Sequence, residues 1–461
     1  MSTPVAPAPE AASARAHSAS AEAKAAGPAD GAAAVRRRFG LDLTPLRARR
    51  DFRLLIGSGI ITTIGSFLTL IAIPMQVKEL TGSYAAVGLV GLAELVPTLL
   101  CSMYGGALAD AHDRRRLAIG CELAMLAGVA ALALNAYRHH PALWLVYVLA
   151  GLIAAAESTQ RPSLEGLLSR YVPHEEMAAA AAVSSLRWNI GGIVGPTVGG
   201  LVVASAGVTP AYLLDVVSFG ISLLFLVRLT PAPPRPGDEG EAGPEQVGLG
   251  SIVTGLRYAA SRRDLLGTYL TDLVAMLLAT PLALYPFIAA EAGGAWVLGA
   301  LYAAESVGAL LATLLSGWTA RIHRHGLATA VATAVWGAMI AAAGLTAMPV
   351  VVVACLVLAG AADLVSGLFR MVMWNQSIPD ELRGRLAGIE LVSYSAGPML
   401  GNARAGLVGQ WGGARFALAS GGLLCVGGVA LVAAALPAFR RYDVRTSPHV
   451  QTERARRHDT L

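Results

Sequence analysis

Long apolar stretches alternate with short polar segments along most of the chain. Each stretch holds about 20 to 29 residues, and about 20 apolar residues in a helix are enough to cross the ~30 Å hydrocarbon core of a bilayer. Only helices and closed barrels satisfy their backbone hydrogen bonds in lipid, and no stretch alternates with the two-residue period of a barrel strand. The pattern therefore predicts twelve membrane-spanning helices, at about 53–77, 84–109, 117–137, 143–169, 178–206, 209–229, 265–289, 295–320, 327–347, 349–377, 384–410 and 412–438.

Composition agrees with an integral membrane protein. Of the 461 residues, 55% are hydrophobic and only 14% are charged, whereas soluble domains carry about 25% charged residues. The four cysteines fall inside apolar stretches and show neither metal-ligand nor disulfide spacing, so we expect no metal and no cofactor. The basic residues behind the net charge of +5 lie in loops between spans, so we expect no nucleic-acid partner.

Basic residues in the loops predict how the chain is oriented. Loops on one side carry eight arginines, and loops on the other side carry only Lys78, Arg138 and Arg415. Loops rich in Lys and Arg stay in the cytoplasm, which places both termini and the central linker there, in an inner or plasma membrane. The eight are Arg114, Arg115, Arg116, Arg170, Arg321, Arg324, Arg383 and Arg385.

Polar segments divide the chain into five regions. Six spans, a linker and six spans in the same orientation predict a parallel repeat about an axis along the membrane normal. Gly195-Pro196 in the fifth span is echoed by Gly397-Pro398 in the eleventh. The regions are a disordered cytoplasmic tail at 1–46, a six-helix bundle at 47–229, a linker at 230–264 with an amphipathic surface helix predicted from 251, a second bundle at 265–438, and a basic cytoplasmic tail at 439–461.

Two local motifs stand out in the first half. After the second span, Gly106 precedes Asp110 and the basic run that includes Arg114 and Arg115. We expect the small residues to let helix ends approach, Asp110 to accept hydrogen bonds from an arginine or a helix N-terminus, and the arginines to face lipid phosphates; the alternative is a solvated loop. The fifth span carries a small-residue face with a built-in kink, at Gly191, Gly195, Pro196, Gly199 and Gly200.

These motifs carry a family resemblance that covers roughly residues 45–442. The loop resembles the signature of the major facilitator superfamily, with Asp113 in place of its usual glycine, and the fifth-span face resembles the motif of its drug-extruding antiporters. The branch that exports enterobactin, which also includes macrolide and other drug efflux proteins, is similar in further runs: Gln160-Arg161-Pro162-Ser163, Ala211-Tyr212-Leu213-Leu214-Asp215, Trp374-Asn375-Gln376-Ser377-Ile378-Pro379 and Gly397-Pro398-Met399-Leu400-Gly401-Asn402.

The resemblance implies an all-α major facilitator fold with twelve helices in two six-helix bundles related by a pseudo-twofold axis. It further implies a secondary active exporter, not an enzyme, that moves a siderophore or drug-like amphipathic molecule by alternating access. We expect protons, a small molecule and the bilayer as partners, and a monomer. A facilitator or importer of a nutrient and a non-transporting sensor on the same fold remain the alternatives.

Charges inside the spans are candidates for function, because each costs about 2.5–3.5 kcal/mol in the bilayer even on the mildest scale. Glu157, Arg161 and Glu165 recur every four residues along one helix face. Arg187 lies at a similar depth in the next helix, so we expect it to pair with Glu157 or Glu165. The set is either a static ion-pair network or a gate and substrate contact. Asp215, Asp272 and Arg404 are further members of this group.

Asp363 is the leading candidate for a proton carrier, because it lies near the middle of the tenth span. Arg370 follows seven residues later on the same face, so the two can form an ion pair that protonation breaks. Glu390 and Glu94 are second choices. The first span lacks the acidic residue that many drug/proton antiporters of the superfamily carry.

Aromatic residues and charges are expected to line a central cavity. A catecholate siderophore would favour the cations Arg161, Arg187, Arg370 and Arg404, whereas a cationic drug would favour the acids. The aromatic candidates are Trp188, Tyr269, Tyr302, Trp374 and Tyr394.

Overall fold

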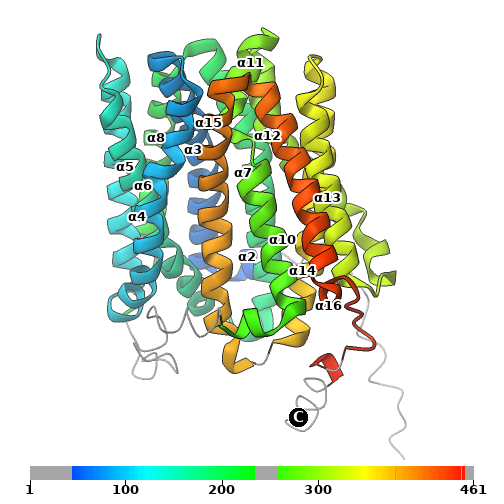
Figure 1. The fold of residues 1–461 in the computed structure, drawn as a ribbon. Coiled ribbons are helices and arrows are strands. Elements are labelled where there is room, and N and C mark those ends of the chain that lie inside the picture. Colours follow the sequence, from blue (N-terminus) through cyan, green and yellow to red (C-terminus); the bar gives the residue numbers. More distant parts are fainter. Residues whose placement is uncertain (1–43, 234–256, 379, 448, 452–461) are drawn as a thin grey trace, which may run out of the picture. The chain divides into compact units, whose positions relative to one another are not determined.

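The computed structural model describes residues 44–233, 257–378, 380–447 and 449–451, and every regular element among them is helical (Figure 1). The first half contains α2 (Thr44–Ala48), α3 (Arg50–Thr81), α4 (Tyr84–Ala111), α5 (Arg114–Tyr137), α6 (Leu143–Tyr171), η1 (His174–Glu176), α7 (Met177–Ala206) and α8 (Val208–Leu226). The second half contains α10 (Arg263–Ala279), η3 (Leu282–Leu284), α11 (Tyr285–Ala292), α12 (Ala295–Leu314), η4 (Ser316–Arg321), α13 (His325–Gly344), α14 (Pro349–Ser377), α15 (Asp380–Ala435) and α16 (Pro437–Arg440).

The last long helix, α15, provides two crossings. It reverses direction at Gly413, whose φ of 79° and ψ of 170° are accessible to glycine and strained for other residues (Figure 1). Eleven helical segments of the described chain are long and apolar enough to cross a membrane, with both arms of α15 counted as one. The predicted all-α architecture of twelve crossings is therefore confirmed, with helix ends that differ from the predicted ones by a few residues.

The seventh crossing differs from its prediction as one continuous helix over 265–289. Its inner part, α10, ends at Ala279, and the chain resumes as the short η3 and then α11. Thr280 has extended backbone angles, with φ −60° and ψ 123°. Pro281 favours that conformation in the residue before it and has no N–H to continue the helical ladder, so the helix breaks inside the bilayer.

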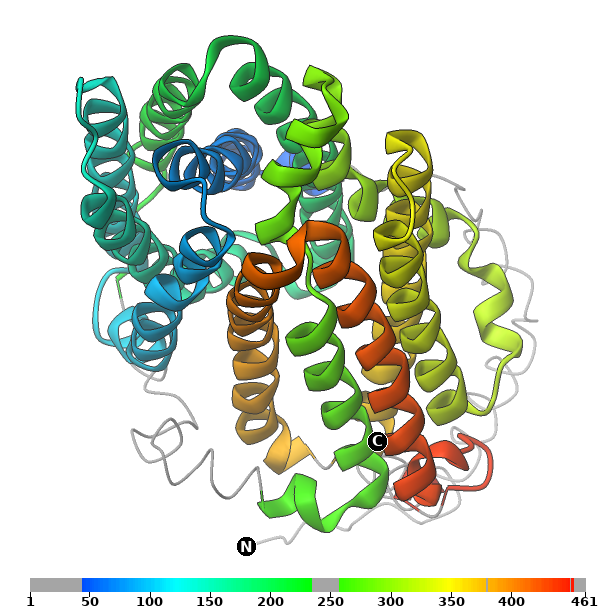
Figure 2. The ribbon, with the colours of Figure 1, turned by 45° about the horizontal axis from the view of Figure 1, so that its top comes forward.

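The helices form two bundles (Figure 2). Helices α3 to α8 pack among themselves, as do α10 and α12 to α15. The bundles meet mainly through two helix pairs, α4 with α15 and α7 with α12. In crossing order these are the second with the eleventh and the fifth with the eighth, so each bundle supplies its second and fifth helices. This interchange is what a pseudo-twofold axis between the halves produces.

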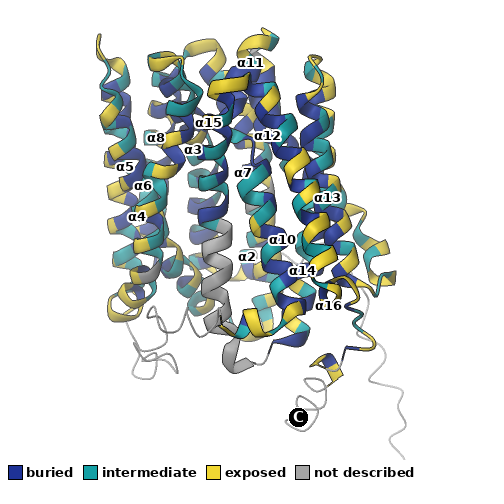
Figure 3. Ribbon diagram, viewed as in Figure 1, coloured by how far each residue is buried: buried dark blue, intermediate teal, exposed yellow. Residues whose placement is uncertain are grey.

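Among the side chains that the structure describes, one large buried cluster joins the two bundles. It includes Val87 and Val90 of the first bundle together with Leu284 and Phe287 of the second. Buried and exposed residues alternate along the helices (Figure 3). Three smaller clusters each lie within a single bundle, near the ends where α3 and α10 begin. We call the end at which α3 begins and α8 finishes the linker side, and the opposite end the closed side.

Each bundle is strapped on the linker side by the chain that leaves its last helix. In the first bundle, the Arg114 amide donates to the Ala232 carbonyl at 3.3 Å, and the Tyr171 hydroxyl donates to the Thr230 carbonyl at 2.7 Å. In the second bundle, the Val444 amide donates to the His323 carbonyl at 3.1 Å. Both straps therefore cross back over the bundle that they have just left.

The second strap falls within the segment predicted as a polar tail at 439–461. Phe439 is fully buried, and Tyr442 and Val450 are nearly so. Phe439 fits against Gly267 and Gly326, where any side chain would collide with it. Burial also raises the pKa of Tyr442. The predicted N-terminal tail lies almost wholly outside the described residues. Of the linker helix predicted over 251–264, the part 251–256 lies outside them and 257–261 is helical.

Replacing Phe439 with Ala tests the strap. A buried Phe→Ala change costs about 3 to 5 kcal/mol, so we expect a clear fall in the midpoint of thermal unfolding in detergent. Phe416→Ala is the matched control, because Phe416 is 57% exposed and its loss should leave the midpoint nearly unchanged. Equal midpoints for the two variants would show that the strap does not stabilise the bundle.

Candidate functional site

Polar and aromatic contacts seal the two bundles together on the closed side. The Lys78 ammonium, near the end of α3, donates to the Pro286 carbonyl of α11 at 2.8 Å. It also lies 5.5 Å from the centre of the Phe287 ring, within cation–π range. The Tyr84 ring of α4 stacks on the same Phe287 ring, with centroids 3.7 Å apart. Phe287 is therefore held from both sides by the first bundle, and we call these four residues the gate.

A second set of polar contacts extends this seal to α15. The Gln410 side-chain oxygen accepts hydrogen bonds from the Ser83 hydroxyl at 2.9 Å and from the Ala85 amide at 3.3 Å. It thereby satisfies a backbone donor in the first turn of α4. Within the second bundle, Arg415 and Glu291 form an exposed ion pair at 3.2 Å.

Small residues let the helix pairs between the bundles approach to backbone contact. A Cβ atom on Gly88 of α4 would lie 2.8 Å from the Asn402 carbonyl oxygen and 3.0 Å from the Gly406 Cα. A Cβ atom on Gly91 would lie 2.6 Å from the Met399 carbonyl oxygen. A side chain at any of these glycines would therefore force α4 and α15 apart.

The fifth-span motif contacts two different helices. Gly195 and Gly199 face α3 beside Phe67, which fills the room that a side chain at Gly195 would need. Gly191 also faces α3, and Pro196 lies inside α7. Gly200 instead lies against Gly299 of α12 so closely that a side chain would collide with the backbone. The motif therefore joins α7 both to its own bundle and to the opposite one.

A cavity lies between the bundles next to the gate. It is small, and residues of α3, α4, η3, α12 and α15 form its wall. Glu94, Tyr302 and Asn402 provide polar side chains, and the other lining residues are apolar or glycine. A mostly apolar wall with a few polar side chains is typical of small-molecule sites.

The break in the seventh crossing lies against this cavity, and side chains from neighbouring helices satisfy its backbone. Lipid offers no hydrogen bonds, so each freed backbone group needs a partner in the protein. The Arg404 guanidinium donates to the Leu278 carbonyl at 2.6 Å, and the Tyr302 hydroxyl donates to the Leu282 carbonyl at 3.3 Å. The Asn402 side-chain oxygen accepts from the Ala283 amide at 3.1 Å. Within the crossing itself, the Thr280 hydroxyl donates to the Met276 carbonyl at 2.6 Å.

Two pairs of carboxylates occupy equivalent positions in the two halves. Glu94 in α4 and Glu305 in α12 both follow the first residue of their helix by ten positions. Glu157 in α6 and Asp363 in α14 both follow theirs by fourteen. Within each half the two acids lie on helices that pack together, α4 with α6 and α12 with α14. The Tyr285 hydroxyl donates to Glu305 at 3.4 Å.

Arg370 has a different partner from the one that its spacing predicted. It forms a buried ion pair with Asp272 of α10, and both side chains are less than 5% exposed. The prediction considered only residues on the same helix, whereas Asp272 lies on α10, which contacts α14. Arg370 and Asp272 therefore join two helices of the second bundle. Asp363 lies one turn from Gly360, which packs against the backbone of Glu305 on α12.

The charged face of α6 is open. Glu157, Arg161 and Glu165 are all exposed, and Arg161 pairs with Glu165 one turn away at 3.3 Å. Arg187 lies over Gly59 of α3, where its guanidinium fills the space that a side chain at position 59 would need. Glu165 thus pairs with Arg161 on its own helix, and the expected pairing of Arg187 with Glu157 or Glu165 stays a prediction.

Asp215 is fully buried inside the first bundle. It accepts hydrogen bonds from the Thr69 hydroxyl at 2.5 Å and from the Ser218 hydroxyl at 2.8 Å. Gly65 leaves room for this cluster, because a side chain there would collide with Asp215 and Ser218. The cluster joins α3 to α8 and lies away from the cavity lining.

The loop motif after α4 organises the linker side of the first bundle. Asp110 pairs with Arg114 at 3.1 Å, and Gly106 has open space around it. Arg115 donates to the Leu226 carbonyl at the end of α8, as expected of a cation at a helix C-terminus. Asp113, which stands where the superfamily has glycine, caps α5 by accepting from the Arg115 and Arg116 amides.

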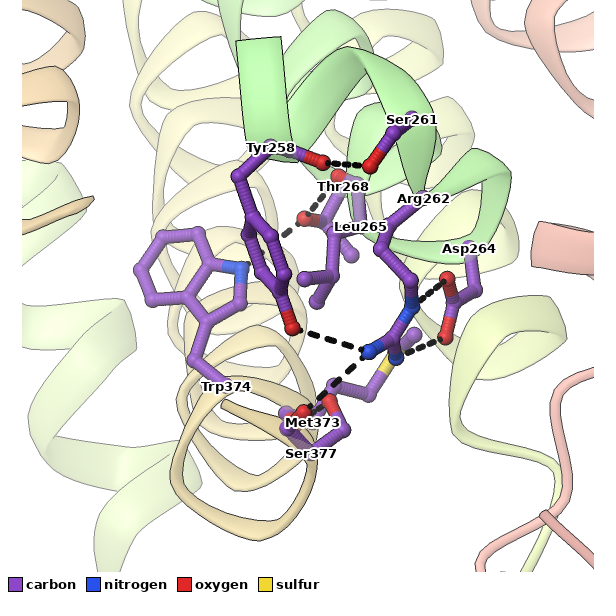
Figure 4. Close-up of polar contacts among 9 residues, drawn as sticks. All are labelled: Tyr258, Ser261, Arg262, Asp264, Leu265, Thr268, Met373, Trp374 and Ser377. Carbon is purple, nitrogen blue, oxygen red and sulfur yellow. Dashed lines mark hydrogen bonds and ion pairs between the residues drawn. The ribbon is translucent and has the colours of Figure 1, made fainter. Parts of the chain in front are cut away.

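A matching arrangement lies at the linker side of the second bundle (Figure 4). Arg262 binds Asp264 through two hydrogen bonds, at 2.9 and 2.7 Å, and donates to the Tyr258 hydroxyl and to the Ser377 carbonyl at the end of α14. Burial opposes the charge of Arg262, but the bonds and charge of Asp264 outweigh it and raise the pKa of Arg262. Arg262 thus connects the start of α10 to the end of α14.

Two of the predicted cavity aromatics lie between α10 and α14, near these contacts. Tyr269 and Trp374 stack with centroids 5.2 Å apart. The Trp374 indole donates to the Thr268 hydroxyl at 2.9 Å, and both of these residues appear in Figure 4. The two aromatic residues pack between α10 and α14 and do not line the cavity between the bundles, whereas Tyr302 does. Three predicted site residues have side chains outside the described set: Trp188, Glu390 and Tyr394.

The gate and the Arg-Arg-Asp run that starts both α3 and α10 were missed in the sequence analysis. Arg49-Arg50-Asp51 at the start of α3 matches Arg262-Arg263-Asp264 at the start of α10, a signal that is visible in the sequence. Asp51 accepts from Thr230 of the first strap at 2.8 Å. No comparable signal marks Lys78, Tyr84 or Phe287, because their partners are more than 200 residues away in the chain.

Comparison with known proteins agrees with this architecture. The model of the family described as transmembrane secretion effector matches residues 41–458. Enterobactin exporter EntS of Shigella flexneri is 31% identical over 416 residues, covering 89% of this chain and 97% of the relative. The protein of the same name from Escherichia coli O1:K1 is 30% identical over 418 residues, with the same coverage of both chains.

Solved structures show the same fold at low identity. The nucleoside transporter NupG superposes with a TM-score of 0.67 at 13% identity, covering 85% of this chain and 100% of the other. A bacterial homolog of the human lysosomal transporter Spinster, in an inward-facing conformation, superposes with a TM-score of 0.64 at 14% identity, covering 86% and 98%.

The chain therefore belongs to the transmembrane secretion effector family of major facilitator transporters. It is a multi-pass membrane protein that transports a small molecule, and its relatives are transporters and not enzymes.

Removing one partner of the buried pair should destabilise the second bundle. Asp272→Asn leaves Arg370 charged and unmatched, which costs about 3 to 5 kcal/mol, so we expect a much lower midpoint of thermal unfolding. The double variant Asp272→Leu with Arg370→Met should recover most of the loss. Glu291→Gln, which removes an exposed pair, should change the midpoint little. A stable Asp272→Asn variant would contradict the assigned pairing.

Removing the central ring of the gate should favour its opening. Phe287→Ala loses a ring stack of about 0.5–1.5 kcal/mol and a cation–π contact of about 0.5–1 kcal/mol, which together correspond to roughly tenfold in the open population. A single cysteine at Val90 in a cysteine-free background should react faster with an impermeant maleimide added from the closed side. Trp411→Ala, at a residue 93% exposed, is the control and should leave the rate unchanged; equal rates would exclude the gate role.

Proposed function

We propose that this member of the family exports a small amphipathic molecule by proton antiport and alternating access. The observation that carries the proposal is the one-sided seal between the bundles. Contacts from Lys78, Tyr84 and Gln410 cross between the bundles on the closed side, next to the cavity. Among the described side chains, the three smaller buried clusters, which lie near the linker side, each stay within one bundle. A transporter in this state takes its cargo from the linker side.

The basic loops favour a cytoplasmic location for the linker side. With that orientation, both termini are cytoplasmic and the state described here faces inward. Cargo then enters the cavity from the cytoplasm and leaves after the gate opens. Each chain contains both bundles and one complete pathway, so a monomer is sufficient for transport. The names of the curated relatives, which are exporters, support this direction.

The gate is suited to repeated opening because its contacts are individually weak. Ring stacking and a cation–π contact contribute about 0.5–1.5 kcal/mol each, and the hydrogen bond from the Lys78 ammonium contributes about 1.5–3 kcal/mol. The surfaces beneath are glycine backbones at Gly88, Gly91 and Gly200, which separate without leaving a buried charge unpaired. Binding of a small ligand supplies enough free energy to shift such a balance.

Asp363 and Glu305 form the proposed proton site. Two carboxylates close together in a poorly solvated interior are costly to charge at once, so the pair is suited to hold one proton and release it. The Tyr285 hydroxyl donates to Glu305 at 3.4 Å and so helps to hold the pair's remaining charge. Arg370 is engaged with Asp272, so the proposed switch is a shared proton and not an ion pair along α14.

The cargo is proposed to be amphipathic because the cavity wall is mostly apolar, with a few polar side chains. The enterobactin exporters named above make a siderophore one candidate, and a drug-like molecule is the other. Of the four arginines considered for a catecholate, Arg370 and Arg404 are engaged in structural contacts.

Transport into inside-out vesicles tests the function and its coupling. With the wild type, an imposed proton gradient should drive uptake of a labelled siderophore or macrolide above its equilibrium level. Asp363→Asn should abolish gradient-driven uptake and retain exchange of labelled for unlabelled cargo, because the cavity is intact. Glu175→Gln removes an exposed linker-side carboxylate and should behave as wild type.

The same vesicle experiment distinguishes an exporter from a facilitator and from a sensor. Uptake that only equilibrates, with or without a gradient, would indicate a facilitator, and binding without flux would indicate a sensor. Unchanged gradient-driven uptake by Asp363→Asn would remove Asp363 from the mechanism.

A further inference from the structure

We infer that the cavity next to the gate binds an ammonium group of the exported molecule, with Glu94 as its counter-charge. The inference rests on the proposed export function and names the chemical class of the cargo, an amphipathic amine. It arises from the wall of the cavity, where the carboxylate of Glu94 lies among mostly apolar neighbours.

The first argument is the charge of the wall. Glu94 is its single carboxylate, and none of its lining residues among the described part of the chain is basic. The remaining wall is apolar except for Tyr302 and Asn402. A carboxylate in an apolar pocket binds a cation strongly because water does not screen the pair, and a positively charged ligand group there relieves the cost of burying the acid.

The second argument is that the wall offers hydrogen-bond acceptors. Pro74, inside α3, has no N–H to donate to the carbonyl of Leu70 four residues earlier, and both residues line the cavity. The Tyr302 hydroxyl donates its hydrogen bond to the Leu282 carbonyl at 3.3 Å, so its oxygen can act only as an acceptor toward a ligand. An alkylammonium carries three N–H donors and no acceptor. Its donors match the carboxylate, the carbonyl and the hydroxyl oxygen in kind.

The third argument removes the opposite choice, an anionic ligand at this position. Arg404 is the cation nearest in sequence to the lining residue Asn402, but its guanidinium donates to the carbonyls of Leu278 and Ala417 and to the Ser420 hydroxyl. Those bonds hold the broken seventh crossing together, so the charge of Arg404 is committed away from the cavity. An anion at the wall would face Glu94 without a compensating cation.

Glu305, the acid of the second half that is equivalent to Glu94, has different surroundings. Ligand binding and proton exchange are therefore assigned to different acids. Glu305 accepts from Tyr285 and does not line the cavity. Glu94 lines the cavity, and no hydrogen bond to its side chain occupies it among the described contacts. The two halves thus keep the same acid at the same helix position and use it in different surroundings.

Equilibrium binding to the purified protein tests the inference without any transport. The probes are dansyl cadaverine, which carries a primary ammonium, and its N-acetyl derivative, which has the same fluorophore and chain without the charge. Dansyl emission reports occupancy. We expect the wild type to bind the amine at least about tenfold more tightly than the acetylated probe, the effect of one charge-assisted contact in a poorly solvated site.

Variants of Glu94 assign the preference to this residue. Glu94→Gln should bring the ratio of the two affinities close to one, and Glu94→Asp, which keeps the charge, should preserve a preference for the amine. Glu175→Gln, an exposed carboxylate on the linker side, should keep the wild-type ratio. A wild-type ratio near one, or a Glu94→Gln ratio equal to that of the wild type, would overturn the inference.

The wild-type ratio is informative even if Glu94→Gln fails to fold, and Glu94→Asp supplies the charge-retaining comparison. The outcome is also separable from the export proposal. Selective binding of the amine without gradient-driven uptake in vesicles would support the site and contradict antiport, whereas uptake of cargo with no selectivity in binding would support antiport and reject the site.

Discussion

The absence of hydrogen-bonding partners in lipid is the constraint on which this structure depends. Each backbone amide and carbonyl within the bilayer needs a partner in the protein, and twelve helical crossings meet that demand almost everywhere. The exception is the break between Ala279 and Leu282. There the demand is met from outside the helix, by Arg404, Asn402 and Tyr302. The cost of breaking a helix in the membrane thus explains three polar side chains in apolar spans.

The break also separates two parts of one crossing with different attachments. The inner part, α10, is fastened to α14 by the buried pair of Asp272 with Arg370 and by the bond from Trp374 to Thr268. The outer part, α11, touches the first bundle at the gate, where Phe287 lies between Lys78 and Tyr84. Strong contacts therefore lie within one bundle, and weak contacts lie between the bundles. This division allows the bundles to move relative to one another while each keeps its own packing.

The two halves retain a common pattern and have diverged in its use. The Arg-Arg-Asp run starts both bundles, yet Asp51 binds the strap through Thr230 whereas Asp264 binds Arg262. The carboxylates at equivalent helix positions are likewise retained, but only Glu94 lines the cavity. Equivalent positions place these acids at similar depths, and the neighbouring helices decide what each acid contacts.

The sequence by itself determined the class of protein, the number of crossings and the repeat of six spans. Those features follow from the length and polarity of local segments, because the bilayer acts on each segment separately. It also marked most of the charges that matter, since a charge within an apolar span is visible without any knowledge of its neighbours. The break at Pro281 could also have been predicted from the sequence, because a proline inside a span removes a backbone donor at a known position.

Only the tertiary structure decided how these charges are paired and which end of the molecule is sealed. Arg370 was assigned to Asp363 from spacing on one helix, and its actual partner, Asp272, lies almost 100 residues away on a helix that packs alongside. Tyr269 and Trp374 were expected in the cavity and instead stack inside one bundle. The gate joins residues more than 200 positions apart. Periodicity shows which face of a helix is polar, but the partner of that face is set by the packing of whole helices, which no local pattern contains.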